Sequence, residues 1–344
     1  MKRILLFLLT LAMLTSLAAC GGDVKPEGTS DLPASVTYPV TVTDQAGRQV
    51  VIEEEPTALV SGYYISTSAL IALELDDRMV GIEAKADKRS IYQLASPELI
   101  SLPSVGSAKE FDLEGCAALN PDLVILPMKL KDAAATLEGL GIDVLLVNPE
   151  NQEQLVEMIA LIATAANKGT RANELLDFIA AREAELAAFT AKTEAPTVYL
   201  AGNSDFLSTA GNAMYQSDMI RQAGGTNAAA EITDTYWVNV SYEQLLAWDP
   251  EYIVLASDAS YTVEDVLADP NLAGCRAVAG GNVYRMPGDA EAWDSPVPSG
   301  ILGSVWLANI LHPEQVTDEY AAAQYQTFYD TFYGFAYQTD GASD

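Results

Sequence analysis

The sequence predicts an α/β fold in which two lobes with mainly parallel sheets are joined by one long rigid α-helix. Three observations predict it. Short apolar segments alternate with helical segments both before and after residue 170, a long amphipathic segment separates these halves, and one short pattern occurs once in each half. Alternation of strands and helices is typical of parallel sheets that are covered by helices on both faces.

The long amphipathic segment runs from Thr170 to about Lys192. Its apolar residues recur at helical spacing, and most of its charged residues fall on the other side. Gly169 separates it from an earlier helix, and Pro196 lies beyond its end. At about 1.5 Å per residue the helix spans about 30 Å, the width of a small domain. We interpret it as a rigid connection between the lobes, with an ordinary core helix as the alternative.

The first residues have the pattern of a lipoprotein signal peptide. Lys2 and Arg3 precede an apolar run at residues 4–14, which is too short to cross a bilayer. The sequence Leu-Ala-Ala-Cys20 resembles a bacterial lipobox, which implies that residues 1–19 are removed and that Cys20 is lipidated. The alternative is a plain secretory signal with an incidental cysteine.

Residues 20–36 are expected to form a flexible tether, because most of this stretch is Gly, Ser, Pro and charged residues without apolar periodicity. Several acyl chains on Cys20 would hold the protein durably, since each buried lipid CH₂ contributes about 0.8 kcal/mol. We therefore expect an extracytoplasmic protein anchored to the cell membrane by lipid, on the outer face of the cytoplasmic membrane or in the periplasm.

Composition excludes several kinds of site. The formal net charge is −30, so the protein will not bind nucleic acid through a basic surface. His312 is the only histidine, which excludes a metal site of several imidazoles and any Ser-His-Asp or Cys-His catalytic site that His312 does not serve. It follows a predicted helix, and we interpret it as structural. Cys116 and Cys275 fall in different halves, where a disulfide would lock the lobes, so we expect free, buried thiols.

The remaining elements follow in chain order. Residues 40–54 alternate apolar and polar around a central Gly47, which predicts a β-hairpin. The first half then predicts strands at 58–61, 80–82, 122–126 and 144–147 and helices at 66–75 and 152–166. The second half predicts strands at 198–201, 252–255 and 283–286 and helices at 217–223, 242–247, 301–311 and 319–337, the last rich in aromatics and expected to pack on a lobe. The expected units are residues 37–168, 169–192, 193–314 and 315–344.

An internal repeat links the two halves. Residues 112–126 align without a gap with residues 241–255, and each copy runs from a good helix N-cap through one short helix and a proline to a buried strand. Each copy places a glutamate at the second position after the cap, Glu114 and Glu243. A carboxylate there favours a helix N-terminus by about 0.3–1 kcal/mol, which explains either glutamate singly. The matched pair also fits a docking surface with two contact points.

With this repeat the sequence resembles the bacterial substrate-binding lipoproteins of ABC importers for siderophores, heme and cobalamin, over roughly residues 38–333. The resemblance implies the class III periplasmic-binding-protein fold, with two Rossmann-like lobes. It also implies a monomer, not an enzyme, that delivers its ligand to an ABC permease dimer with a cytoplasmic ATPase, with Glu114 and Glu243 docking onto arginines of the two permease halves. It rests further on residues 102–106, 139–142, 223–227, 237–243 and 302–314.

Ligands of open parallel sheets bind outside the carboxyl ends of the strands. In the first lobe, six of the 18 Lys and Arg residues lie in three loops expected there or nearby, which favours an anionic ligand such as a ferric siderophore. Alternatively, these side chains solvate their loops or pair with local acids. Tyr and Trp residues in the second lobe suit aromatic or macrocyclic ligands. The expected ligand-binding residues are Tyr63, Tyr64, Lys85, Lys109, Lys129, Tyr215, Tyr236, Trp237 and Trp293, with no direct metal ligand and no cofactor.

The expected function is capture of a ferric siderophore in the cleft between the lobes, with cobalamin next in order. Trp237 matches a ligand-contacting tryptophan of cobalamin-binding relatives, but Lys85 and Ala108 stand where those relatives carry aromatics. Heme or an oxyanion would fit the same family. A chelatase-type enzyme and a surface adhesin are the alternatives from other classes, and the single histidine and the lipid anchor disfavour the enzyme.

The anchor assignment predicts that Cys20→Ser releases the protein into the medium, because the acceptor for the lipid is lost. Immunoblots of membrane and soluble fractions measure this. A Cys20→Ser protein that stays on the membrane as tightly as the wild type would contradict the assignment.

Overall fold

The first lobe is built on a four-stranded parallel sheet. The computed structural model describes residues 31–338, so the signal peptide and Cys20 lie outside the described part of the chain. The strand order is β4 (Met79–Gly81), β3 (Leu59–Ser61), β5 (Leu123–Pro127) and β6 (Asp143–Val147). β3 and β5 are buried along their whole length, as expected for strands covered on both faces.

Helices cover both faces of this sheet. α1 (Tyr64–Ala72) and α5 (Gln152–Ala165) contribute to one core, and α3 (Leu113–Ala118) and α4 (Lys131–Gly139) contribute to a second core on the other face. α2 (Ser90–Ala95) follows β4. The predicted hairpin is confirmed as β1 (Val40–Thr43) and β2 (Gln49–Ile52), which lies against β6.

The second lobe contains a six-stranded mixed sheet. Its order is β10 (Trp237–Asn239), β8 (Ser208–Ala210), β7 (Thr197–Ala201), β11 (Tyr252–Leu255) and β12 (Val283–Arg285), with β9 (Thr226–Asn227) also pairing with β7. The sequence predicted only β7, β11 and β12. β8, β9 and β10 are two or three residues long, and β10 is largely exposed, so none carries a strong apolar pattern. The helices are α7 (Tyr215–Gln222), α8 (Tyr242–Trp248), α9 (Val263–Leu267), α10 (Arg276–Gly280) and α11 (Ile301–Leu311).

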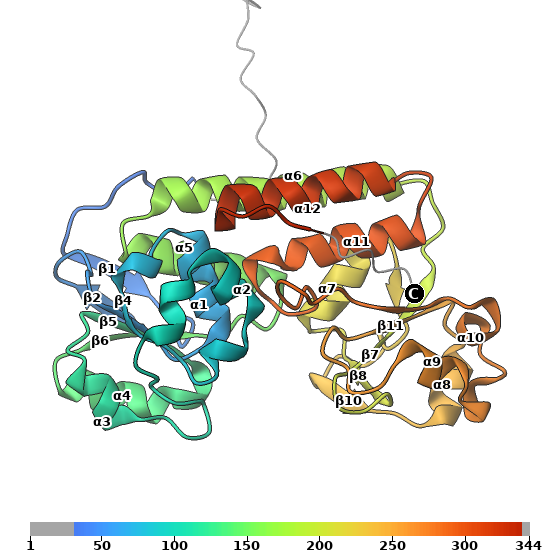
Figure 1. Ribbon diagram of the computed structural model, residues 1–344, viewed down its shortest axis with the longest axis horizontal. Coiled ribbons are helices and arrows are strands. Elements are labelled where there is room, and N and C mark those ends of the chain that lie inside the picture. The colour runs from blue at the N-terminus through green and yellow to red at the C-terminus, as the bar shows by residue number, and fades with distance from the viewer. Residues whose placement is uncertain (1–30, 339–344) are drawn as a thin grey trace, which may run out of the picture.

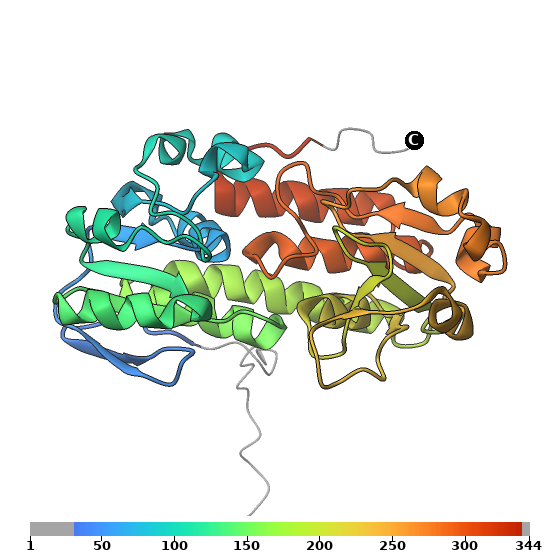
Figure 2. The same ribbon diagram turned by 90° about the horizontal axis from the view of Figure 1, so that it is seen from below.

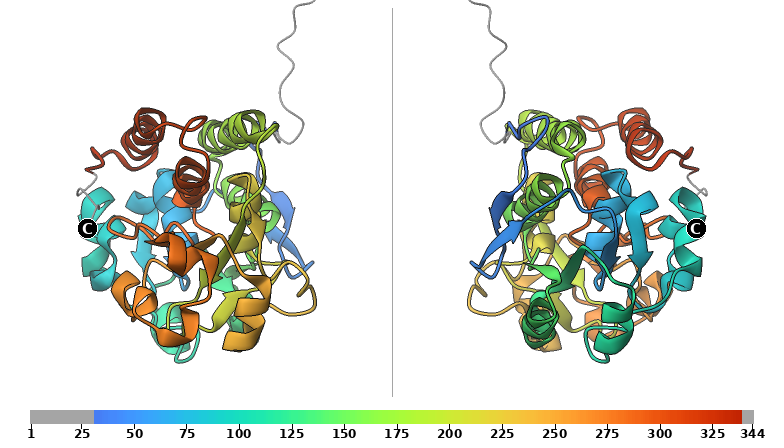
Figure 3. Two further views of the ribbon diagram at one scale, coloured as in Figure 1. Left: turned by 90° about the vertical axis from the view of Figure 1, so that its right-hand side faces the viewer. Right: turned by 90° about the vertical axis from the view of Figure 1, so that its left-hand side faces the viewer.

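The predicted connecting helix is confirmed as α6, Gly169–Thr190, which runs along both lobes (Figure 1). The C-terminal helix α12 (Asp318–Tyr333) lies beside it, and Figure 3 shows the two helices side by side. Phe178 of α6 meets Phe328 and Phe332 of α12 edge to face, at centroid distances of 5.3 and 5.7 Å. α12 also contacts α1 of the first lobe and α11 of the second, so this helix packs against both lobes rather than one.

The lobes also touch each other directly. Seen from below, they lie side by side with α6 crossing both (Figure 2). Tyr215 donates its backbone N–H to the Glu150 carbonyl at 2.8 Å, and Ser68 of α1 donates to the Glu291 carboxylate at 2.5 Å. These contacts tie the second lobe to the first close to α6.

The two cysteines and the single histidine of the described chain lie in buried positions. Cys116 and Cys275 are free and buried, as predicted, and burial raises the pKa of Cys116 to about 11. His312 is buried with its Nε2 3.3 Å from the Gly224 carbonyl oxygen, which agrees with a structural role. Within residues 31–338, no helix is both long and apolar enough to cross a membrane.

Because Phe328 of α12 is fully buried against Phe178 of α6, Phe328→Ala should lower the free energy of unfolding by about 3–5 kcal/mol. Urea denaturation measures this. Leu140→Ala is the matched control, since Leu140 is 62% exposed and its loss should have little effect. Similar losses in the two variants would show that the aromatic contact between α6 and α12 is not a major source of stability.

Candidate functional site

The candidate site lies where the carboxyl end of β3 meets the second lobe. Tyr63 and Tyr64 follow β3 and form an edge-to-face pair with centroids 5.4 Å apart. The Tyr64 hydroxyl lies 3.4 Å from the Ser295 hydroxyl of the second lobe. Burial raises the pKa of both tyrosines, so each presents a neutral phenol at physiological pH. Tyr64 therefore marks the junction of the two lobes.

Arg89 lies on this junction. Its guanidinium carbon is 4.0 Å from the centroid of the Tyr64 ring, a cation–π arrangement. Arg89 immediately precedes α2, and its side chain is 37% exposed. The sequence placed Arg89 in a basic loop after a strand but did not distinguish it from the neighbouring lysines. Only the contact with Tyr64 singles it out.

The guanidinium of Arg89 donates no hydrogen bond to any residue of the described chain. The nearest acid is Glu83, whose Oε1 lies 3.6 Å from Arg89 Nε, too far for a hydrogen bond. The Glu83 carboxylate is instead held by the hydroxyls of Tyr92 and Thr67, both at 2.7 Å. Burial raises the pKa of Glu83, and the two hydroxyls and Arg89 oppose that rise. Arg89 thus combines a fixed position with unused N–H donors, which suits a carboxylate or an oxyanion.

The three predicted lysines, Lys85, Lys109 and Lys129, are all exposed. In the described part of the chain none of them forms an ion pair with a carboxylate. By contrast, Lys88 pairs with Asp87 at 3.0 Å, and Arg89 lies near Glu83. Pairing with local acids therefore explains Lys88 and, through a longer ion pair with Glu83, part of the position of Arg89, but it does not explain the three lysines.

Two of the predicted aromatics of the second lobe are accessible. Tyr236 is 49% exposed and Trp237 is 42% exposed. Trp237 opens β10, and its ring lies next to Gly202, where an added Cβ would be 3.1 Å from Trp237 Cζ3. Gly202 directly follows β7, so Trp237 lies at the carboxyl end of that strand, in the short strand β10 rather than in a loop as predicted.

Trp293 and Tyr215 correct the prediction, because both are core residues that are 1% exposed. Trp293 Nε1 donates to the Tyr329 hydroxyl at 2.8 Å, and the indole ring packs against Tyr325, with centroids 4.7 Å apart. Both partners belong to α12. The sequence places Trp293 in a loop but does not reveal that α12 covers that loop.

The repeated glutamates occupy matching positions. Glu114 lies in the first turn of α3, where Asp112 accepts from Gly115 N at 2.9 Å, and Glu243 lies in the first turn of α8, capped by Ser241. Both glutamates are exposed. α3 and α8 lie in different lobes, both on the side away from α6 (Figure 1).

Comparison with known proteins agrees with this architecture. Residues 59–290 match the family described as periplasmic binding protein. The molybdate-binding protein MolA of Haemophilus influenzae is 27% identical over 341 residues, covering 91% of this chain and 96% of that protein. A cobalamin-binding protein of Halobacterium salinarum is 23% identical over 317 residues, covering 89% of this chain and 84% of that protein. The crystal structure of a periplasmic solute-binding protein from Veillonella parvula has a TM-score of 0.76 at 27% identity, covering 87% of this chain and 94% of that one.

The family match covers most of the chain, the relatives bind solutes rather than catalyse reactions, and the fold has the two lobes and the single connecting helix of class III periplasmic binding proteins. The chain belongs to the periplasmic binding protein family and is a substrate-binding protein of an ABC importer.

Proposed function

We propose that this protein binds an anionic, metal-containing ligand between its lobes, either a ferric siderophore or an oxyanion of the molybdate type, and delivers it to a permease. The observation that carries the proposal is Arg89, whose guanidinium is held on the Tyr64 ring with no hydrogen bond to another described residue. A planar guanidinium matches carboxylate, catecholate and oxyanion edges with two parallel hydrogen bonds.

Charge supports the same proposal. A protein with a net charge of −30 repels anions at long range, so an anion requires a local concentration of donors. Arg89 and the exposed Lys85, Lys109 and Lys129 provide the candidates in the first lobe. One relative is named a molybdate-binding protein. Because molybdate is an oxyanion, this similarity supports an anionic ligand.

Cobalamin is the second candidate, favoured by Tyr236 and Trp237. These are large exposed aromatics next to the carboxyl end of β7, a surface that suits a macrocycle. The similarity to a cobalamin-binding protein over 89% of the chain gives the same candidate.

The two ligand classes predict different effects of substituting Arg89. If the ligand is anionic, Arg89→Gln should weaken binding by about 10- to 150-fold, because a charge-assisted hydrogen bond contributes about 1.5–3 kcal/mol. Isothermal titration with molybdate and a panel of ferric siderophores measures this. Lys192→Gln removes one exposed positive charge beyond the end of α6 and should leave the affinity unchanged.

Binding of cobalamin that survives Arg89→Gln but is lost in Trp237→Ala would replace the anion proposal with the second candidate. Equal weakening by Arg89→Gln and Lys192→Gln would show that overall charge, rather than Arg89, governs binding.

We further propose that Glu114 and Glu243 dock onto the two halves of the permease while a lipid on Cys20 holds the protein at the membrane. Both glutamates are exposed, on short capped helices of different lobes on one side of the molecule.

For docking, Glu114→Ala and Glu243→Ala should reduce uptake of the ligand by cells while leaving its affinity for the purified protein nearly unchanged. Uptake of labelled ligand and titration calorimetry measure the two quantities. Glu98→Ala, at another exposed acid of the first lobe, is the control. Normal transport by the double mutant, or a loss of binding as large as the loss of transport, would contradict docking.

A further inference from the structure

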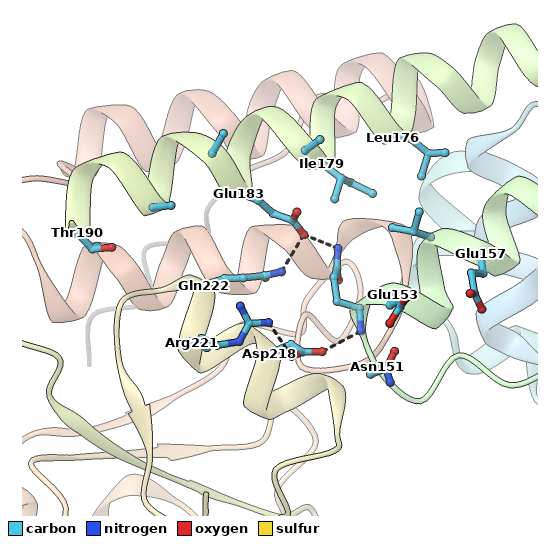
Figure 4. A pocket seen from close by; sticks show the side chains of 15 residues that line it. Asn151, Glu153, Glu157, Leu176, Ile179, Glu183, Thr190, Asp218, Arg221 and Gln222 are labelled. Atoms are coloured by element: carbon cyan, nitrogen blue, oxygen red, sulfur yellow. Dashed lines mark hydrogen bonds and ion pairs between the residues drawn. The ribbon is translucent and has the colours of Figure 1, made fainter. Parts of the chain in front are cut away.

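A large cavity lies away from the candidate site, against the connecting helix. Its volume is about 990 Å³, and its walls come from α5 of the first lobe, α7 of the second and α6, which joins them (Figure 4). Neither Arg89 nor any residue predicted to bind ligand lines it. The cavity is therefore distinct from the proposed anion site, and its chemistry is independent of the ligand bound there.

The charges around this cavity are mainly negative. Glu153 and Glu157 of α5, Glu183 of α6 and Asp218 of α7 line it, with Arg221 as the only basic lining residue. Arg221 Nη2 is already paired with Asp218 Oδ1 at 2.8 Å. Among the lining residues, none of the three glutamates forms an ion pair within 4 Å, although the charge of Arg221 acts on Glu183 at longer range.

Glu183 is partly buried and projects from α6 toward α5 and α7 (Figure 4). Its Oε1 accepts hydrogen bonds from Gln152 Nε2 and Gln222 Nε2, both at 2.8 Å. Its Oε2 accepts none from the described residues. Burial raises the pKa of Glu183, and the Gln152 and Gln222 amides and the Arg221 charge oppose that rise without cancelling it, so compensation of the charged form is incomplete. A cation in the cavity would supply that compensation.

Gln152 gives an independent indication. It is 8% exposed and lines the cavity, and its Oε1 has no hydrogen-bond donor within the described chain. Its backbone N–H donates a hydrogen bond to Asp218 Oδ2 at 3.1 Å, and its Nε2 donates one to Glu183 Oε1. The unused groups of Gln152 and Glu183 are therefore both acceptors. An occupant that satisfies them must bring N–H or O–H donors, as an ammonium group does.

The shape and chemistry of the walls favour an organic cation over a metal ion. Leu176, Ile179 and Ala180 form an apolar stretch of α6 on the side of Glu183 that leads to Glu157 (Figure 4). At about 1.5 Å per residue, Leu176 lies about 10 Å along the helix from Glu183. In residues 31–338, no cluster of three or more His, Cys, Asp or Glu side chains could hold a metal ion.

We propose that this cavity binds a linear aliphatic polyamine. One ammonium group lies against Glu183 and Gln152, the methylene chain runs along Ile179 and Leu176, and a second ammonium group lies near Glu153 and Glu157. The ligand touches the first lobe, the connecting helix and the second lobe together. Its binding therefore opposes movement of the lobes relative to each other.

Spermidine is the probe for the test, titrated calorimetrically into the full-length protein in detergent at about 0.15 M salt, where exposed charges are screened within about 8 Å. One saturable site is expected, and Glu183→Gln should weaken it at least tenfold. Gln retains an oxygen for the two glutamine donors, so the fold is kept. The matched control is Glu174→Gln on the same helix, at an exposed residue outside the cavity, which should change the affinity less than twofold.

A second variant tests shape without changing charge. Ala184→Leu adds volume at an exposed lining position, so it should fold normally and weaken spermidine binding at least tenfold. Equal affinities of Glu183→Gln and Glu174→Gln, or unchanged binding by Ala184→Leu, would overturn the proposal, since the polycation would then be held only by the overall acidity of the surface. The absence of a saturable site in the wild type would overturn it as well. None of these outcomes bears on the binding of an anion at Arg89.

Discussion

The packing of α12 on α6 is the constraint on which the arrangement of the two lobes depends. Phe328 and Phe332 of α12 pack edge to face against Phe178 of the connecting helix α6. α12 also contacts α1 in the first lobe and α11 in the second. Aromatic contacts of this kind are buried and directional, so they hold the two lobes in one orientation relative to each other. Hydrogen bonds such as the one from Ser68 to Glu291 then join the lobes in that orientation.

The fixed orientation explains how Arg89 can be held in place while its donors stay unused within the described chain. The guanidinium of Arg89 lies over the ring of Tyr64, and the Tyr64 hydroxyl contacts the Ser295 hydroxyl of the second lobe. A cation–π contact holds the position of the guanidinium plane without using its N–H groups. The hydroxyls of Tyr92 and Thr67 donate to Glu83, and this acid approaches Arg89 only as an ion pair at 3.6 Å, without a hydrogen bond. The guanidinium of Arg89 thus makes no hydrogen bond within the described chain, as the proposed anion site requires.

The two proposed sites have opposite chemistry because of how the lobes meet. At Arg89 the unused groups are donors on a positive charge, whereas in the cavity against α6 the unused groups are acceptors next to Glu183. The chain has 48 acidic and 18 basic residues, so an acceptor-rich surface is common on it. A donor-rich surface requires the fold to bring several of the few basic side chains together. Basic residues gathered by a fold are therefore the stronger indication of function.

The sequence by itself determined the class of fold and the parts of it that depend on local pattern. Periodicity predicted the connecting helix, the hairpin and the main buried strands, because amphipathic spacing and buried apolar runs are properties of neighbouring residues. The repeat placed Glu114 and Glu243 on matching helices for the same reason. The short strands β8 to β10 form through long-range pairing, so their own residues carried too little signal.

Only the tertiary structure decided which of the predicted site residues are accessible at the surface. Trp293 and Tyr215 are aromatic residues of the kind that bind ligands, yet α12 covers Trp293, and Tyr215 is buried in the core that both lobes share. Arg89 is one of six basic residues in the three first-lobe loops, and only its contact with the Tyr64 ring sets it apart. Exposure and pairing depend on segments far apart in the chain, and the spacing of residues along a sequence does not carry that information.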